Sequence, residues 1–124
     1  MEGEELGLED VMATKQEIVE QIHAIQRSMA KVSAYTDIID LIGKYEGTLQ
    51  RKLNDANKKK ERIGQRDHKS QAYLDIVASA SILQAQLLET HNLRIDLMEK
   101  LVELKEENLR IGNSAKEFVG KLDV

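Results

Sequence analysis

The chain contains no cysteine, no proline and no tryptophan, and phenylalanine occurs once among its 124 residues. Without cysteine there is no disulfide framework, no thiolate metal site and no cysteine nucleophile. The absence of proline removes the commonest residue that ends a helix, and the scarcity of aromatic residues argues against a β-sheet. Together with 32% charged residues, these absences favour long helices that associate through aliphatic side chains.

Long apolar runs are also missing. No stretch approaches the ~20 apolar residues that a membrane-spanning helix needs. Residues 1–10 are acidic and lack the apolar segment of a secretory signal peptide. From these two features we expect a cytoplasmic protein with no membrane span.

A first long helix is predicted from residue 14, where Thr-Lys-Gln-Glu has the spacing of a capping box. Apolar residues then recur every three or four positions, as in a coiled coil, at Ile18, Ile22, Ile25, Met29 and Val32 and, after a shift, at Ile38, Ile42, Tyr45, Leu49, Leu53 and Ala56. Because no glycine or proline stands at the shift, we expect one continuous helix that ends at Gly64. The alternative is a bend near Ser33, which would give a three- to four-helix bundle.

A second long helix is predicted from about Ser70 to Ile111, with Gly112 as its end. Two rows of apolar residues run along it, one with Ile76, Leu83, Leu97, Leu104 and Ile111, the other with Leu74, Leu88, Ile95, Val102 and Leu109. Residues 112–124 are expected to form a short C-terminal helix, and residues 1–13 a loose acidic arm.

These elements predict an all-α fold, a long antiparallel helical hairpin of coiled-coil type over residues 14–111. Its apolar zones end together if Ile18 faces Leu109 and Leu53 faces Leu74. In that register two helical glycines, Gly43 and Gly47, would lie against the small side chains of residues 78–81. Close approach of the two backbones would then explain them, since glycine costs about 1 kcal/mol relative to alanine inside a helix. A frayed or bent segment is the alternative.

The second helix carries more apolar surface than one partner helix can cover. Its apolar rows span about 160° of the circumference, whereas an antiparallel partner covers a narrower seam. We therefore expect a homo-oligomer or a protein partner to cover a candidate association face made of Leu74, Leu87, Leu88, Ile95, Leu101, Val102 and Leu109.

A basic tip is predicted at the polar turn, residues 54–71. The whole chain has a net charge of −4, yet its candidate partner-binding residues here and just before are all basic: Arg51, Lys52, Lys58, Lys59, Lys60, Arg62, Arg66 and Lys69. Nucleic acid, an anionic lipid surface or an acidic protein surface would each complement this charge. The acidity of the whole chain and its few aromatic residues make nucleic acid a less favoured partner. The simplest alternative is that the lysines only keep the turn soluble.

No pattern of catalytic or cofactor-binding residues is present. Glu20 and His23 share the Glu-x-x-His spacing of di-iron bundles, but those sites use the motif twice. We expect no catalytic residue, cofactor or metal, and we expect His91 to be partly buried and hydrogen-bonded. The leading hypothesis is a non-enzymatic scaffold or assembly subunit that self-associates. The alternatives are a binding module whose basic tip engages a polyanion, and a small helical chaperone for an amphipathic helix.

Overall fold

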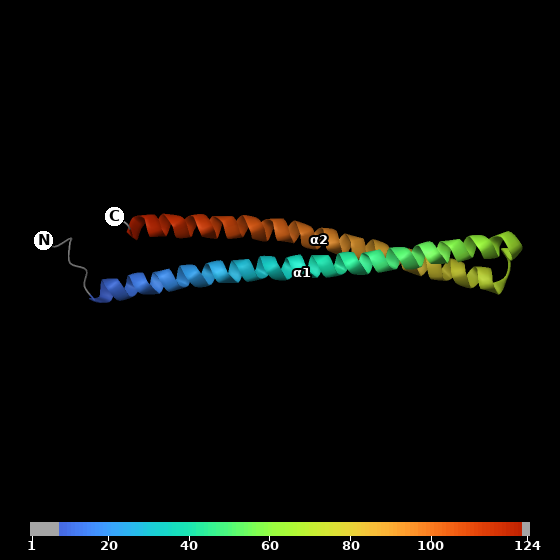
Figure 1. Cartoon of the computed structure of the whole chain (residues 1–124), viewed down its shortest axis with the longest axis horizontal. Coiled ribbons are helices and arrows are strands. Elements are labelled where there is room, and N and C mark those ends of the chain that lie inside the picture. Colours follow the sequence, from blue (N-terminus) through green and yellow to red (C-terminus); the bar gives the residue numbers. More distant parts are fainter. Residues whose placement is uncertain (1–7, 123–124) are drawn as a thin grey trace. The chain divides into compact units, whose positions relative to one another are not determined.

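The computed structural model describes residues 8–122, which form two helices joined by a tight turn (Figure 1). Helix α1 spans Leu8–Asp67 and helix α2 spans Gln71–Leu122. No strand occurs among these residues, so the predicted all-α hairpin is confirmed. Neither described helix contains a segment apolar and long enough to cross a membrane.

The turn between the helices is held by hydrogen bonds from Asp67 and Ser70. The Asp67 carboxylate accepts from the Lys69 amide at 3.0 Å, and the Asp67 carbonyl accepts from the Ser70 hydroxyl at 2.9 Å. The same hydroxyl oxygen accepts from the Tyr73 amide at 3.1 Å, which makes Ser70 the N-cap of α2. The helix start expected near Ser70 is therefore confirmed.

The sequence pattern predicted that the first helix ends at Gly64, and this prediction is wrong. Helix α1 continues to Asp67, and no described glycine has a positive φ. A Cβ at Gly64 would lie 3.0 Å from Cε2 of Tyr73. The glycine is thus needed for the close approach of the Tyr73 ring, and the turn lies several residues farther along the chain.

The chain packs as two units, each containing part of α1 and part of α2. In residues 35–99, the inner positions recur at alternating spacings of three and four on both helices. We call these inner positions the seam; in this unit they are Tyr35, Ile39, Ile42, Glu46, Leu49, Leu53, Ala56, Lys60 and Ile63 on α1, and Tyr73, Ile76, Ala80, Leu83, Leu87, Thr90, Arg94 and Leu97 on α2. Leu53, Ala56 and Ala80 form its buried centre, with Ile76, Leu83 and Leu87 packed around them.

The other unit pairs the α1 residues up to 34 with the α2 residues from 100 onward. Its seam consists of Gln21, Ile25, Ser28 and Val32 on α1, and Leu101, Leu104, Asn108, Ile111, Ala115 and Phe118 on α2. Ser28 and Leu104 are its buried members. Helix α2 continues through Gly112, so the predicted end at that glycine and the separate terminal helix are wrong. The seam spacing continues to Phe118, so packing along the seam favours a helix beyond Gly112.

The predicted shift of the α1 apolar row is not observed. Ile22, Met29, Ile38 and Tyr45, which were assigned to that row, are exposed. The seam keeps its spacing of three and four throughout. Some of its positions are occupied by polar residues, among them Glu46, and a search for apolar residues alone does not find these positions. Helix α1 passes Ser33 without a break, so the expected continuity is confirmed and no new helix begins there.

The predicted register is also wrong. Leu53 packs with Ala80, and Leu74 is exposed. A turn at Asp67 to Ser70, in place of Gly64, moves every α1 residue to a later partner on α2. Of the predicted acidic arm, residues 1–7 lie outside the described part of the chain, and residues 8–13 belong to α1.

Candidate functional site

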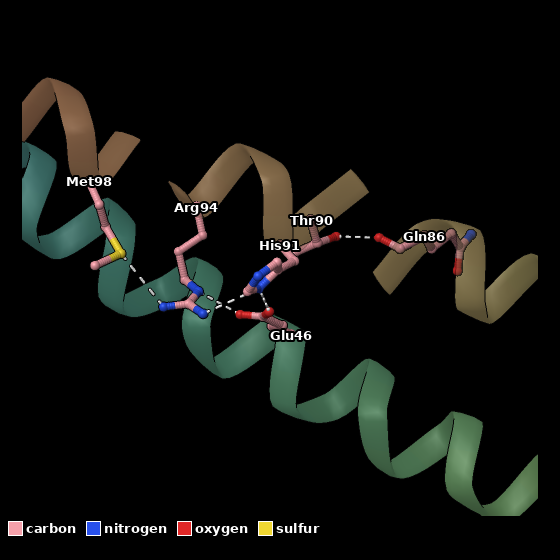
Figure 2. A network of polar contacts seen from close by, with 6 residues as sticks. All are labelled: Glu46, Gln86, Thr90, His91, Arg94 and Met98. Atoms are coloured by element: carbon pink, nitrogen blue, oxygen red, sulfur yellow. Dashed lines mark hydrogen bonds and ion pairs between the residues drawn. The ribbon is translucent and has the colours of Figure 1, made fainter. Parts of the chain in front are cut away.

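A cluster of three charged or titratable residues joins α1 to α2 within residues 35–99 (Figure 2). Glu46 comes from the seam of α1, and its side chain is only 18% exposed. One carboxylate oxygen accepts from Nε of Arg94 at 2.5 Å, and the other lies 2.5 Å from Nδ1 of His91. The partial burial and hydrogen bonding predicted for His91 are thus confirmed.

The geometry assigns a proton to Nδ1 of His91. An ionised carboxylate can only accept, so Nδ1 donates to Glu46. The same nitrogen cannot then accept from Nη2 of Arg94, which lies 3.4 Å away; we treat that distance as a contact between neighbours. Nη1 of Arg94 points toward the sulfur of Met98 at 3.7 Å (Figure 2).

The cluster keeps Glu46 ionised. Removal from water raises the pKa of the Glu46 carboxyl, but the hydrogen bonds from Arg94 and His91 and their positive charges outweigh this effect. The net result is a pKa below the ordinary value of 4.5. Glu46 therefore remains a charged acceptor for two α2 side chains over the neutral pH range.

An open groove lies beside this cluster, between α1 and α2. We call it the glycine groove; it has a volume of about 680 Å³ and is lined by Gly43, Glu46, Gly47 and Gln50 of α1 and by Gln84, Leu87, Leu88 and His91 of α2. The α1 wall is low because two of its residues lack side chains. The α2 wall is raised by Leu88, which is 60% exposed.

The packing of the hairpin does not require either glycine of this groove. A Cβ at Gly47 would meet nothing within 4 Å, and one at Gly43 would make only an ordinary contact of 3.9 Å with Cδ of Arg94. The predicted close approach of these glycines to residues 78–81 is therefore wrong. Each glycine destabilises the helix by about 1 kcal/mol relative to alanine. Because both residues lack a side chain, open space remains at the surface.

A second row of residues runs along α2 next to the seam. Within residues 71–99 this second stripe consists of Leu74, Val77, Ser81, Gln84, Leu88, His91, Ile95 and Met98, again at alternating spacings of three and four. Leu74, Leu88, Ile95 and Met98 are exposed. A helix that carries two adjacent stripes of this kind is typical of a bundle in which it contacts two neighbours.

The predicted association face divides between these two rows. Leu74, Leu88, Ile95, Val102 and Leu109 are exposed. Leu87 and Leu101 are half-buried seam residues instead. Leu87 packs against the buried centre of its unit, so it supports the hairpin.

The residues of the predicted basic tip lie on the last turns of α1 and in the turn. Of the eight, Lys60 is half-buried and the others are exposed. Arg51 donates to the Thr48 hydroxyl at 3.2 Å. Three of them, Lys59, Arg62 and Arg66, line a hollow of about 280 Å³ together with Ile63; we call it the basic hollow.

No protein-family model, curated protein or solved structure matches the chain. Within residues 8–122, no three histidine or acidic side chains gather in a way that would hold a metal ion. The glycine groove, the second stripe and the basic hollow are the features of the described residues that bear on function.

Proposed function

We propose that the protein is a non-enzymatic assembly subunit that associates with a second copy of itself through the second stripe of α2 and the glycine groove. The observation that carries this proposal is the exposure of Leu88 and Ile95, at 60% and 39%, in a row with coiled-coil spacing. Covering an aliphatic side chain of this size contributes roughly 1.5–3 kcal/mol.

The face is complementary to itself. It carries a ridge, Leu88 followed by Ile95, and a hollow whose wall is lowered by Gly43 and Gly47. In a two-fold dimer the ridge of one copy meets the hollow of the other, and the same contact forms twice. Small residues in the hollow let the two helices approach closely, which strengthens van der Waals contact.

The small core of the hairpin supports the need for a second copy. Within residues 35–99 the buried apolar side chains are Leu49, Leu53, Ala56 and Ala80. Two of these four are alanines, which contribute little apolar area. Because a small core offsets little of the conformational entropy of folding, an added helix layer stabilises the fold.

The test replaces Leu88 and Ile95 with lysine and measures the mass by light scattering after gel filtration. We expect the double variant to shift toward the monomer mass of 14.1 kDa, because two charges would be buried in the interface. Leu41→Lys is the matched control, since Leu41 is equally apolar and 67% exposed on α1 but lies outside the glycine groove. An unchanged mass in the double variant, with helicity retained, would refute the proposed interface.

A further inference from the structure

The basic hollow near the turn is separate from the association face, and its positive charge suits a different kind of ligand. Lys59, Arg62 and Arg66 stand three and four residues apart on α1, so their side chains share one face of the helix. All three are exposed, and they line one hollow. Half-buried Ile63 forms the apolar part of its wall.

In the part of the chain that the structure describes, no ion pair neutralises these three side chains. Among the described residues, the ion pairs are those of Glu46 with His91 and Arg94, and of Lys100 with Glu103. None of them involves a residue of the basic hollow. Like charges three or four residues apart on a helix repel one another, so a bound anion in the hollow would relieve this repulsion.

We propose that Lys59, Arg62 and Arg66 form a binding site for a compact, phosphate-rich anion. The two guanidinium groups present planar pairs of donors that match phosphate oxygens, and the ammonium group adds a point charge. The seven helical steps from Lys59 to Arg66 rise about 10 Å along the helix axis. That length suits a short chain of phosphate groups. The apolar wall at Ile63 strengthens the attraction by keeping water from one side.

The experiment titrates tripolyphosphate into the full chain by calorimetry at low and moderate salt. The wild-type chain is expected to bind saturably, more weakly as salt rises, and with an increase in melting temperature because the anion binds the folded state. A triple variant, Lys59→Gln, Arg62→Gln and Arg66→Gln, should lose at least about tenfold in affinity, since each charged hydrogen bond contributes substantially. The single variant Arg62→Gln should lose part of this and serves if the triple variant does not fold.

The matched control neutralises the same number of charges outside the hollow: Lys52→Gln, Lys58→Gln and Lys69→Gln. None of these lysines lines the basic hollow, so binding should weaken only slightly. Equal losses in the two triple variants, or no binding by the wild type, would overturn the proposal. So would tighter binding to duplex DNA that depends equally on the control lysines, because it would replace a compact site with diffuse attraction.

A second arm identifies the source of the phosphate. Vesicles of phosphatidylcholine with phosphatidylinositol 4-phosphate are added to the wild-type chain and to both variants. Binding that tripolyphosphate displaces, and that only the hollow variant loses, assigns the site to a lipid headgroup. Tripolyphosphate binding without vesicle binding assigns it to a soluble anion, and both results support the proposed site.

Discussion

At the scale of single residues, Glu46 shows how a charged side chain at a seam position selects one alignment of the two helices. Its carboxylate is satisfied by His91 and Arg94 at 2.5 Å each. In any other register it would be withdrawn from water without these partners, at the cost of an unpaired partly buried charge. We infer that the cluster specifies register, as polar residues at coiled-coil seams do.

The first prediction concerns acid stability. The pKa of Glu46 is lowered in the folded state. Its contribution to the free energy of unfolding is therefore fully present above the ordinary pKa of 4.5, and it is lost as the pH falls through the pKa of the folded state. Glu46→Gln should lower the free energy of unfolding near neutral pH by about 1 kcal/mol, since the group keeps some contact with water. Its stability should also fall less steeply than that of the wild type below pH 4.5. Urea unfolding at a series of pH values measures both effects.

Glu103→Gln is the control for this prediction. Among the described residues, Glu103 pairs with Lys100 alone, at 3.4 Å, and both side chains are largely exposed. Its substitution should change stability by no more than about 0.5 kcal/mol. Identical pH profiles for the two variants would show that the Glu46 cluster contributes no more to stability than the exposed ion pair of Glu103.

Residue patterns predicted part of this cluster. The partial burial of His91 follows from its place beside apolar neighbours on the second helix. The apolar pattern does not single out Glu46 or Arg94, because charged residues on a helix usually lie on its solvated face. The available signal was spacing: Glu46 falls between Ile42 and Leu49 at the intervals of four and three that seam residues keep.

At the scale of the elements, the sequence predicts two long helices and their antiparallel pairing, but not where the first one ends. In the sequence, Gly64 resembles the glycine that commonly follows the last turn of a helix. Its actual role depends on the Tyr73 ring, which packs against it from the other helix. A glycine needed for close packing and a glycine needed for a left-handed cap look the same in sequence.

The register was unpredictable for a related reason. Helix α2 carries two adjacent stripes with coiled-coil spacing, and apolar periodicity does not say which one faces α1. The outermost apolar residues chosen to align the helices, Leu74 and Leu109, belong to the exposed row. The packing of Ala80 and its neighbours on the seam of α2 against Leu53 and Ala56 of α1 identifies the stripe that faces α1.

The second prediction contrasts two glycines of α1. Gly47→Ala should raise the free energy of unfolding by about 0.5–1 kcal/mol, because alanine favours the helix and its Cβ meets nothing. Gly64→Ala should gain less or lose stability, because its Cβ would press on the Tyr73 ring. Both effects refer to the monomeric hairpin, because Gly47 lines the proposed interface and its Cβ would also meet a partner copy. Urea unfolding at a concentration low enough to keep the chain monomeric compares the two variants. Equal stabilisation by both substitutions would mean that the Tyr73 contact imposes no constraint.

At the scale of the whole molecule, two surface features support the proposed self-association. Exposed aliphatic residues follow the second stripe, and the glycines of the groove leave room that the hairpin itself does not fill. Exposed apolar side chains that recur along one face of a helix are typical of an interface. The basic hollow shares no lining residue with the glycine groove, so the proposed association would leave the hollow open to an anion.

The most direct test of this account is the mass of the unsubstituted chain in solution, measured by sedimentation equilibrium from low to high micromolar concentration. We predict a mass that rises with concentration to a multiple of 14.1 kDa, because the second stripe becomes covered by another copy. A mass of 14.1 kDa at every concentration, with the helices intact, would contradict self-association.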